Sequence, residues 1–350
     1  MYEHIEVILP NLKRRLSGVT ATLVRLLPIQ AKSMGIVAVG LGLPDELPKV
    51  SICSLFLMDK KKIRVWHARR NTEMLLGLIL KKIFRKNLKL VFTSASQRHH
   101  TRYTRFLISR MDAVIATSKK SASYLKSSSV VILHGIDTKK FYPVVDKSVV
   151  RRTLNVPDCT LIGCYGRIRH QKGTDIFVDS MIELLPEFSN ISALVMGRAT
   201  NEHHAFLRDL RQRVKQARLE DRILFLPESP VDKMSNWYQV LDLFVAPQRW
   251  EGFGLTPLES MACGVPVIAS DVGAFDELIE EGKTGMIIPP GDKLHMVRAV
   301  HSMLISPQKM QDWSIRCRQQ MELHFSIENE VNSINDLYRS MLLDGTARIS

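Results

Sequence analysis

Short apolar runs recur along the whole chain, and most of them are separated by stretches long enough to form helices. Runs of this length that are rich in Val and Ile predict buried strands, and their alternation with helices is typical of parallel sheets covered on both faces. The pattern therefore predicts an α/β fold with two parallel sheets, one in each half of the chain. The predicted strands cover residues 5–10, 35–40, 62–68, 89–95, 112–118, 130–137, 161–168, 193–198, 223–228, 243–247, 266–270 and 285–290.

The segment over residues 137–158 interrupts this rhythm, because it has two prolines, mixed charge and weak periodicity. A chain of 350 residues is also long for a single hydrophobic core. We therefore predict an N-terminal domain over residues 1–145, a second domain over residues 150–325, and a C-terminal helix over residues 326–350 that packs back on the N-terminal domain. Ligands of open parallel sheets bind at the carboxyl ends of the strands, so the loops that follow the strands should carry the chemistry.

The positive charge of the chain is concentrated in its first part. Residues 1–150 contain 27 Lys and Arg and 9 Asp and Glu, a net charge of +18, whereas the remaining 200 residues contain 22 and 26, a net charge of −4. An asymmetry of this size indicates an anionic partner for the N-terminal half, such as nucleic acid, an acidic membrane surface or a phosphorylated substrate. A solvated basic surface without a partner is the other interpretation that the charge alone leaves open.

The cysteines and the apolar segments indicate in which cellular compartment the protein lies. The five cysteines form no C-x-x-C pair and no metal-ligand spacing, so they are typical of apolar filler residues in a reducing environment. The longest apolar run, over residues 74–80, is too short to span a bilayer, and the first residues lack the basic segment and apolar core of a signal peptide. These features predict a cytoplasmic protein without a membrane-spanning helix.

The sequence "YGRIRHQKG" (residues 165–173) follows a predicted strand and leads into a helix near Gly173. Arg167 and Lys172 flank this turn beside the positive end of the helix, which is an arrangement suited to phosphate oxygens. A turn with ordinary solvated basic residues explains the same pattern, and this motif alone does not decide between the two interpretations.

The sequence "WEGFGLTPLES" (residues 250–260) also runs from the end of a strand into a helix, and its glycines let the backbone approach a ligand closely. Thr256 is a natural N-cap residue, and Glu259 three positions later completes the pattern of a capping box. A capping box would give Glu259 a structural role that needs no ligand. Glu251 precedes the turn and fits no such pattern, so it is the stronger candidate for chemistry.

Together these motifs resemble the donor-binding half of family 4 retaining glycosyltransferases. The family pattern has two glutamates separated by seven residues, here Glu251 and Glu259. A Gly-Arg pair and a Lys-Gly pair precede them, here residues 166–167 and 172–173. Residues 134–143 also resemble the segment that links the two domains in this family. The resemblance implies the GT-B fold, in which two Rossmann-like parallel-sheet domains face a central cleft.

Three N-terminal segments narrow the resemblance, because "LPNLKRRLSGVT", "VWHARRN" and "SQRHHTRYT" are most similar to the mannosyltransferases of lipopolysaccharide core assembly. This finer resemblance implies a retaining transfer of mannose from GDP-mannose to the Kdo-bearing lipid A inner core, without a cofactor or an essential metal ion. The partners that it implies are a nucleotide sugar, an anionic lipid-linked saccharide acceptor and a membrane surface, but no nucleic acid. The protein would then be peripheral on the cytoplasmic face of the inner membrane.

The resemblance also assigns roles to individual residues. Arg167 and Lys172 neutralise the diphosphate as it leaves, a kind of charge stabilisation that is worth roughly 3–4 kcal/mol per well-placed donor. Glu251 contacts hydroxyl groups of the donor sugar, and Glu259 accepts hydrogen bonds from the ribose. The other residues implied in donor binding are Gly18, Gly197, Leu226, Phe253, Gly254, Leu255 and Thr256.

The chain departs from the family pattern at two places. His134 stands at the start of the linking segment, where Asn is more usual. The histidine that orients the donor sugar in many members is missing, because residues 94–96 are Ser-Ala-Ser at the expected position. His67 is our candidate for the catalytic histidine and His99 is a second one. A structural or solvent-facing histidine is an equally good interpretation of each.

Basic residues of the N-terminal half lie at predicted loop and helix starts, where an acceptor with phosphates and carboxylates would meet them. Residues 75–89 join an apolar stretch to five basic residues. This segment either lies on an anionic membrane or forms a helix that packs on the sheet and has a solvated basic end. The candidates for acceptor or membrane binding are Arg14, Arg15, Arg69, Arg70, Arg98 and Arg102.

Other functions fit parts of the sequence. A member of the same family that uses UDP-glucose or UDP-galactose on another lipid-linked or polysaccharide acceptor would share every motif above, and donor assays would separate the two. A non-catalytic protein that binds an anionic polymer would explain the basic half, but it leaves Glu251 and Lys172 without a role and no aromatic stacking motif supports it. A dinucleotide-binding oxidoreductase is disfavoured, because no strand is followed by a complete G-x-G-x-x-G motif with its acidic partner.

Overall fold

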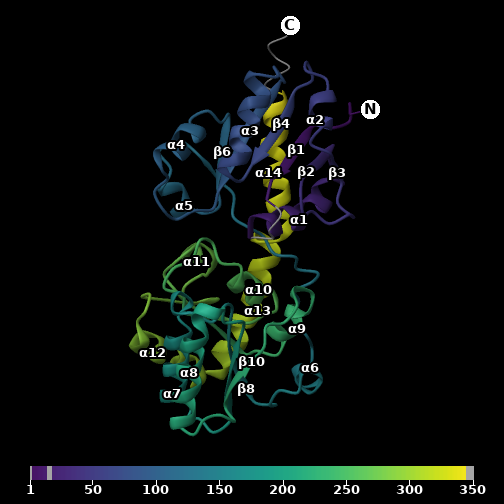
Figure 1. Ribbon diagram of the computed structural model, residues 1–350. Helices are drawn as coiled ribbons and strands as arrows, with labels where there is room; N and C mark the ends of the chain where they lie inside the picture. The colour runs from purple at the N-terminus through teal and green to yellow at the C-terminus, as the bar shows by residue number, and fades with distance from the viewer. Residues whose placement is uncertain (1, 14–17, 344–350) are drawn as a thin grey trace. The chain divides into compact units, whose positions relative to one another are not determined.

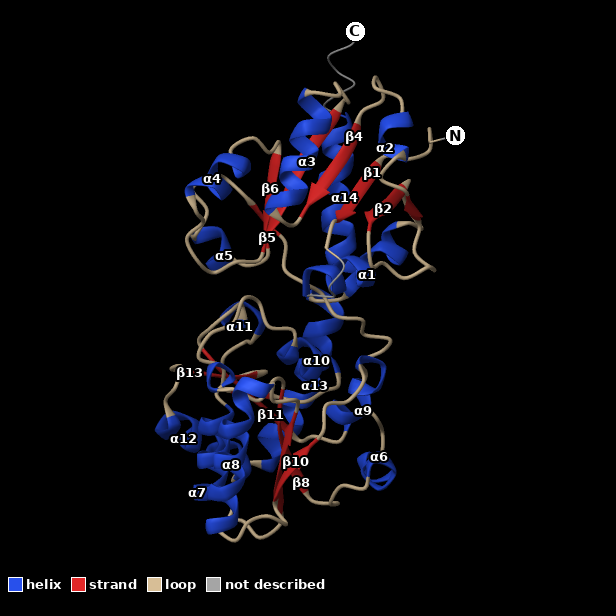
Figure 2. Cartoon of the chain, in the orientation of Figure 1, coloured by secondary structure: helices blue, strands red, loops and turns tan. Residues whose placement is uncertain are grey.

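The computed structural model describes residues 2–13 and 18–343, and the chain divides into two compact units. Met1–His134 and Ile327–Ser350 form the first unit, and Gly135–Ser326 forms the second (Figure 1). Each unit contains one parallel sheet, and Figure 2 shows the strands of each sheet with helices beside them.

The first unit is built on a seven-stranded sheet. Its strands are β1 (Val7–Asn11), β2 (Ile36–Gly40), β3 (Lys49–Val50), β4 (Arg64–Ala68), β5 (Leu88–Ser94), β6 (Ala113–Ala116) and β7 (Val130–Val131). Its helices are α1 (Gly18–Gln30), α2 (Ser54–Leu57), α3 (Asn71–Lys82), α4 (Arg102–Ile108), α5 (Lys119–Ser123) and α14 (Ile327–Leu343). The strand order is β3-β2-β1-β4-β5-β6-β7, and every paired strand runs parallel to its neighbour.

The first unit has a hydrophobic core on each face of its sheet. Successive residues of a strand point to opposite faces. Val7 and Leu9 accordingly pack with α1 and α14, whereas Ile8 packs with α2, α3 and α4. A buried hydrogen bond of 2.9 Å from the side-chain amide of Gln30 to that of Asn335 ties α14 to α1. The C-terminal helix is therefore an integral layer of the first unit.

The second unit is built on a six-stranded sheet. Its strands are β8 (Thr160–Tyr165), β9 (Ile191–Met196), β10 (Ile223–Leu226), β11 (Leu243–Ala246), β12 (Val267–Ser270) and β13 (Gly285–Ile288). Its α-helices are α6 (Lys147–Leu154), α7 (Thr174–Leu184), α8 (His204–Gln216), α9 (Met234–Gln239), α10 (Thr256–Ala262), α11 (Phe275–Leu278), α12 (Lys293–Leu304) and α13 (Pro307–His324). Three 3₁₀ turns complete it: η1 (His170–Lys172), η2 (Asn201–His203) and η3 (Val231–Lys233). The strand order is β10-β9-β8-β11-β12-β13, with parallel pairs throughout.

The two faces of the second sheet are covered differently. Aliphatic residues join α7, α8 and α12 to one face, with Phe177 of α7 at the centre of that cluster. The opposite face carries a group of three aromatic rings, those of Tyr165, Tyr238 and Phe244. The centroids of these rings lie between 5.3 and 5.7 Å apart in edge-to-face arrangements. Tyr238 belongs to α9, so this aromatic group packs α9 on the sheet, and the hydroxyl of Tyr238 reaches the carboxylate of Glu259 in α10 at 2.7 Å.

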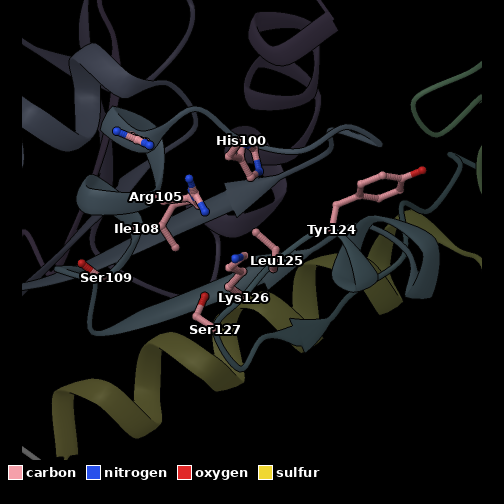
Figure 3. A pocket seen from close by; sticks show the side chains of 9 residues that line it. His100, Arg105, Ile108, Ser109, Tyr124, Leu125, Lys126 and Ser127 are labelled. Atoms are coloured by element: carbon pink, nitrogen blue, oxygen red, sulfur yellow. The ribbon is translucent and has the colours of Figure 1, made fainter.

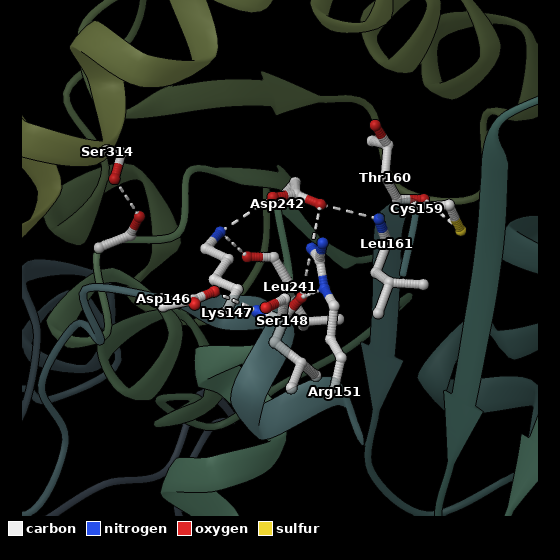
Figure 4. A network of polar contacts seen from close by, with 12 residues as sticks. Asp146, Lys147, Ser148, Arg151, Cys159, Thr160, Leu161, Leu241, Asp242 and Ser314 are labelled. Carbon is white, nitrogen blue, oxygen red and sulfur yellow. Dashed lines mark hydrogen bonds and ion pairs between the residues drawn. The ribbon is translucent and has the colours of Figure 1, made fainter. Parts of the chain in front are cut away.

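A network of ion pairs anchors α6 to the same sheet (Figure 4). The carboxylate of Asp242, just before β11, accepts hydrogen bonds from Lys147 at 2.9 Å and from Arg151 at 2.7 Å. It also accepts one from the backbone N–H of Leu161 in β8 at 2.9 Å. Arg151 is buried, so its charge needs this carboxylate as a partner. The network holds β8 and β11 side by side at their amino ends.

The structure confirms the predicted α/β class with two parallel sheets, and each predicted strand overlaps an observed one. The short strand β3 was not predicted, because two residues carry no periodic signal. The domain boundary also differs from the predicted one at residues 145–150, since the units divide after His134. The reason is that the following segment packs on the second unit. The backbone N–H of Ile136 donates to Phe325 at 2.7 Å, and Arg318 donates to the carbonyl of Phe141 at 2.8 Å.

The sequence leaves two interpretations of residues 75–89, a segment that lies on an anionic membrane or a helix that packs on the sheet with a solvated basic end. The structure shows that the helix packs on the sheet. Helix α3 packs on β4 so tightly that a Cβ at Gly77 would lie 2.6 Å from the ring of Trp66. The helix therefore packs on one face of the sheet. Its last residues and the turn after it carry the exposed basic side chains. None of the helices within residues 2–13 and 18–343 is both long enough and apolar enough to cross a membrane.

Candidate active site

The strand order of the second sheet reverses between β8 and β11. Ligands of open parallel sheets bind beyond the carboxyl ends of the strands at such a point. Residues 166–173 follow β8, and residues 247–255 follow β11. The two sequence motifs therefore lie together at the position in this sheet where a ligand is expected.

The loop after β8 lies directly against the end of β9. The N–H of Gly166 donates to the carbonyl of Met196 at 2.9 Å, and a Cβ at Gly197 would lie only 1.8 Å from the carbonyl oxygen of Gly166. Gly197 also has a φ of +149°, which L side chains rarely adopt. Glycine is thus required at position 197 to keep this loop in place. The loop presents Arg167, which is exposed and has no hydrogen-bond or ion-pair partner within residues 2–13 and 18–343.

Lys172 and Glu251 connect the two motifs. The Nζ of Lys172 forms an ion pair with Oε2 of Glu251, and Oε1 of Glu251 accepts a hydrogen bond of 3.0 Å from the N–H of Gly252. The side chains of Lys172 and Glu251 remain 21% and 18% exposed, so a ligand can reach both. A pair that is held together but still accessible can open to bind a phosphate with the ammonium and a hydroxyl group with the carboxylate.

A second ion pair, which the sequence motifs did not reveal, holds the turn that carries Lys172. Arg249 binds both carboxylate oxygens of Asp175 at 2.7 Å and also donates to the carbonyl of His170 at 2.6 Å. Burial raises the pKa of Asp175, but the hydrogen bonds and charge of Arg249 outweigh it and lower the pKa below its usual value. The bidentate pair therefore stays charged and holds η1 against the loop after β11.

The Gly-Phe-Gly turn depends on the second glycine. Gly254 has a φ of +89°, and a Cβ there would lie 2.2 Å from the ring of Phe275 and 3.0 Å from Cγ of Glu251. The side chain of Phe253 is buried, and its carbonyl accepts a hydrogen bond of 3.0 Å from Ala274. Phe253 therefore anchors the turn through packing, whereas the close approach at Gly254 sets the position of the Glu251 side chain.

The predicted capping box at the start of α10 is wrong. The helix begins at Thr256, its N-cap residue is Leu255, and the side chain of Leu255 forms no cap. The N–H of Glu259 donates to the carbonyl of Leu255 at 3.0 Å, while the hydroxyl of Thr256 is buried without a hydrogen-bond partner. The carboxylate of Glu259 instead accepts a hydrogen bond of 2.7 Å from the buried hydroxyl of Tyr238. Burial, reinforced by Glu259, raises the pKa of Tyr238, so the tyrosine remains a donor to this carboxylate.

A small hollow lies beneath the two motifs, and it reveals a residue that the sequence did not single out. Gln248 follows β11 and is only 3% exposed, yet its Oε1 has no hydrogen-bond partner in the described part of the chain. A buried amide oxygen without a partner is costly, so a ligand donor there would be favourable. The hollow is lined by Cys164, Tyr165, Gly166, Arg167, Ile168, Lys172, Thr174, Val195, Met196 and Gln248.

His67, our candidate for the catalytic histidine, has a structural role instead. It is 1% exposed, its Nδ1 is hydrogen-bonded to the hydroxyl of Tyr338, and its Nε2 lies 2.6 Å from the hydroxyl of Thr93. Burial, and then the charge of Arg69, lowers the pKa of His67 well below its usual value. Both ring nitrogens are therefore occupied inside the first unit, and neither is available to a sugar.

A different histidine lies next to the strand end where the family histidine is expected. His100 is half-buried, and its Nε2 lies 3.2 Å from the hydroxyl of Ser94, the last residue of β5. Burial, and then the charge of Arg98, lowers the pKa of His100. His99, by contrast, is exposed and its ring packs edge-to-face on Tyr124 at 5.2 Å. The sequence did not identify His100, because it lies six positions after Ser94.

The basic residues proposed for ligand binding in the first unit differ in their surroundings. The guanidinium of Arg70 donates to Asn11 at 2.9 Å, to Glu73 at 2.7 Å and to Thr20 at 3.0 Å, so it joins β1, α1 and α3. Arg69 lies beside it with one terminal nitrogen buried and without a hydrogen-bond partner. Arg70 therefore stabilises the fold, which corrects its prediction as a ligand-binding residue. Arg98 and Arg102 are exposed, and Arg14 and Arg15 lie outside the described residues.

The remaining predicted residues are placed as follows. Leu226 ends β10, and its carbonyl accepts a hydrogen bond of 3.4 Å from Gly197, which puts it at the edge of the site. Gly18 is the first residue of α1 in the first unit, and a Cβ there would meet no atom within 4 Å. The described residues contain no group of three or more His, Cys, Asp or Glu side chains that could hold a metal ion. Whether the reaction needs a metal stays a prediction.

Comparison with known proteins identifies the family. Residues 147–320 match the family model described as glycosyl transferases group 1. The chain is 50% identical to the lipopolysaccharide core biosynthesis mannosyltransferase LpsB of Rhizobium meliloti (strain 1021), over 97% of this chain and 98% of that protein. The chain belongs to the group 1 glycosyl transferases. It is therefore a glycosyltransferase, and the predicted enzyme class is confirmed.

Other relatives agree with this assignment. This glycosyltransferase is 46% identical to the mannosyltransferase LpcC of Rhizobium leguminosarum bv. viciae, over 97% of each chain. The solved structure of Anabaena HepE in complex with UDP matches 96% of the chain with a TM-score of 0.83 and 19% identity. That likeness shows the fold, which is GT-B as predicted. The roles of the individual site residues stay predictions that the geometry now makes specific.

Proposed function

We propose that this glycosyltransferase transfers mannose from GDP-mannose, with retention of configuration, to the Kdo-bearing inner core of lipopolysaccharide. The observation that carries the proposal is the 50% identity, over almost the whole of both chains, to a protein named as a core mannosyltransferase. The site at the ends of β8 and β11 supports the donor half of the proposal, because it combines accessible cations with a carboxylate. No cofactor or essential metal ion is part of it.

The proposed reaction uses the site residues in separate roles. Arg167 and Lys172 bind the diphosphate and neutralise the charge that develops as it leaves. Glu251 accepts hydrogen bonds from the mannose hydroxyls, and Glu259 accepts them from the ribose. The ion pair between Lys172 and Glu251 supports this division, since the donor must separate the two side chains and each then faces a different part of the ligand.

The donor is tested by a competition among nucleotide sugars. The full-length enzyme is incubated with membranes that carry an inner core without outer-core sugars, and with radiolabelled GDP-mannose, UDP-glucose or UDP-galactose. We expect label in the lipid only from GDP-mannose. Transfer from a UDP-hexose instead would refute the donor, and transfer from none of the three would refute the proposed reaction. HepE was solved in complex with UDP, so the uridine donors are the relevant competitors.

The stereochemistry is tested on the product of one turnover. GDP-mannose carries an α-linkage, so retention predicts an α-mannoside, which NMR distinguishes from the β-anomer by the coupling across the anomeric C–H bond. A β-mannoside would show inversion and would remove the basis for a retaining mechanism.

We also propose that the enzyme is peripheral on the cytoplasmic face of the inner membrane, where its lipid-linked acceptor would lie. An exposed apolar group of the first unit supports this: Phe56, Leu57, Ile83 and Phe84 are 45%, 76%, 69% and 39% exposed. The rings of Phe56 and Phe84 lie 4.8 Å apart, so the group is continuous. The chain around it is basic, with Lys60, Lys61, Lys62, Lys81, Lys82 and Arg85, whereas Lys86 is buried and donates to the carbonyls of Phe56 and Met58. Apolar side chains ringed by cations favour an anionic bilayer surface.

Flotation with liposomes tests the membrane proposal. We expect the enzyme to float with vesicles that contain anionic lipid, and Leu57→Ser with Ile83→Ser to abolish flotation. Ile315→Ser is the matched control, because Ile315 is 56% exposed in the second unit and should leave flotation unchanged. Flotation of the double variant as efficiently as the parent would rule this surface out.

A further inference from the structure

A cavity of about 390 Å³ lies in the first unit between α4 and the turn that follows α5. It has the volume of a small-molecule site, for which roughly 300–1,000 Å³ is usual. In Figure 3, Arg105 and Ile108 of α4 lie on one side of the cavity, and Leu125 and Lys126 on the other. The lining residues are His100, Arg102, Arg105, Ile108, Ser109, Tyr124, Leu125, Lys126 and Ser127.

The cavity is lined by cations without acidic partners. Arg102, Arg105 and Lys126 are exposed, and within residues 2–13 and 18–343 their side chains form no hydrogen bond or ion pair. No lining residue is acidic. Residues 88–134 contain eight Lys and Arg and a single acid, Asp112, which is paired with Lys81 at 2.7 Å. The local positive field is therefore not neutralised by the protein itself.

The other lining groups suit a sugar that carries a negative charge. The hydroxyls of Ser109 and Ser127 can both donate and accept hydrogen bonds, as sugar hydroxyls require. Ile108 and Leu125 supply apolar wall, whereas the ring of Tyr124 packs edge-to-face on His99 at 5.2 Å. Such a mixture of apolar surface with a few placed polar groups is typical of ligand sites, whereas a solvated basic surface has no need of a cavity.

His100 connects the cavity to the carboxyl edge of the sheet. It lines the cavity, and its Nε2 lies 3.2 Å from the hydroxyl of Ser94 at the end of β5. Ligands of parallel sheets bind at this edge. His100 therefore links one wall of the cavity to the strand end of β5.

We propose that this cavity binds an anionic group of the acceptor saccharide, a carboxylate or a phosphate, through Arg105, Lys126 and Arg102. The inference rests on the proposed function, because that function supplies an acidic, phosphorylated acceptor. Arginine and lysine both pair strongly with such oxyanions, and Arg does so through two parallel hydrogen bonds. The cavity thus selects acceptors by charge, independently of the donor site in the second unit.

Equilibrium binding to the full-length protein tests the proposal without catalysis. The probes are Kdo, which has a carboxylate and no phosphate, glucosamine 1-phosphate, which has a phosphate and no carboxylate, and mannose as the neutral control. We expect one or both anions to bind at millimolar concentration and mannose not to bind. Their relative affinities identify which charged group the cavity takes.

Variants locate the binding in the cavity. Arg105→Gln with Lys126→Gln should weaken anion binding about tenfold, since each removes a charge-assisted hydrogen bond. The matched control is Arg110→Gln with Lys32→Gln, because both residues are exposed, both lie outside the cavity, and the net charge changes by the same amount. The control should bind the anions with unchanged affinity. In the transfer assay the cavity variant should raise the acceptor KM about tenfold and leave kcat and the donor KM unchanged.

The outcomes separate this inference from the proposed function. If neither anion binds, or if the cavity and control variants lose affinity equally, the cavity is not the anion site, whatever sugar the enzyme transfers. If anion binding depends on Arg105 and Lys126 but the enzyme uses no nucleotide sugar, the cavity is supported as an anion site and the proposed reaction is refuted. Sugar transfer with an unchanged acceptor KM in the cavity variant would also overturn the inference.

Discussion

The two units differ in net charge and in how far their basic side chains are paired. Residues 135–326 contain 23 Lys and Arg and 24 Asp and Glu, a net charge of −1, whereas residues 1–134 and 327–350 contain 26 and 11, a net charge of +15. In the second unit the key cation, Lys172, is already paired with Glu251 and its turn is fixed by Arg249 and Asp175. In the first unit Arg102, Arg105 and Lys126 line a cavity with no acid beside them.

This difference indicates how each unit would bind an anionic ligand. A preformed ion pair costs little to hold in position and releases each charge only to a ligand of the right geometry, which favours selectivity and catalysis. Unpaired cations instead attract any anion and depend on long-range attraction. This difference is consistent with the proposals that the second unit binds the donor and the first unit binds an anionic acceptor.

The largest expected effect is the loss of Glu251. Glu251→Ala should lower kcat by about 10²–10³, because it removes the carboxylate that we propose contacts the sugar and leaves Lys172 without its partner. Single-turnover transfer with the parent donor measures the loss, and the thermal midpoint should stay close to that of the parent because the carboxylate is partly exposed. Glu251→Gln separates charge from shape. If the glutamine variant keeps full kcat, the carboxylate charge has no role in turnover.

Gly197 is the next test, because it holds the loop that carries Arg167 in place. Gly197→Ala puts a Cβ 1.8 Å from the carbonyl of Gly166, so it should cost about 1–3 kcal/mol of unfolding free energy and weaken donor binding by displacing Arg167. Gly18→Ala is the matched control in the first unit, where a Cβ meets nothing within 4 Å. Equal stability of the two variants in chemical denaturation would show that the loop can move aside.

Loss of the Glu259 carboxylate should have a smaller effect, on donor binding and not on turnover. Glu259→Ala should raise the donor dissociation constant about tenfold and leave kcat nearly unchanged, since its carboxylate is expected at the ribose. Tyr238→Phe removes only the hydroxyl that donates to Glu259 at 2.7 Å, so it tests whether the orientation of that carboxylate matters. Titration of GDP or UDP followed by fluorescence measures both. A loss of kcat with unchanged donor affinity would assign Glu259 to the chemical step.

Sequence patterns were sufficient for the strands and for the two motifs, because both are local. The apolar runs predicted the strands of the described residues except the two-residue β3, and the spacing of Glu251 and Glu259 pointed to the proposed site. Contacts between distant segments were not predictable in the same way. Asp175 and Arg249 are 74 residues apart, and nothing in either neighbourhood indicates that they form a pair.

Two of the errors at individual residues have a common physical cause. Thr256 and Glu259 have the spacing of a capping box, but the turn before α10 starts the helix one residue earlier and leaves the threonine inside it. His67 lies one residue before the end of a strand, near where a catalytic histidine is expected, but α14 returns from the far end of the chain and covers it with Tyr338. In both cases tertiary packing decided a role that local sequence leaves open.

Salt provides a milder test of the difference between the units. Raising the ionic strength from about 0.05 to about 0.5 M shortens the screening length several-fold, so exposed unpaired cations lose most of their attraction. We expect the acceptor KM to rise several-fold while the donor KM changes less, because Lys172 and Glu251 are partly shielded. Initial rates with each substrate varied in turn measure both constants. An equal salt dependence of the two would mean that the units do not differ in this respect.

The smallest effect concerns His67 and the pH dependence of stability. Burial lowers the pKa of His67 well below 6.5, so the unfolded chain binds a proton on this ring at a higher pH than the folded chain does. The stability that the neutral ring contributes is therefore complete above the unfolded pKa of about 6.5 and is lost as the pH falls toward the folded pKa. His67→Gln should flatten the decline of unfolding free energy below about pH 6.5, measured by denaturation at a series of pH values.

His100→Gln is the comparison, because His100 is less buried and should change this slope less. If the slope of His67→Gln equals that of the parent, the ring is not held neutral in the folded protein, and its exclusion from catalysis would need to be reconsidered.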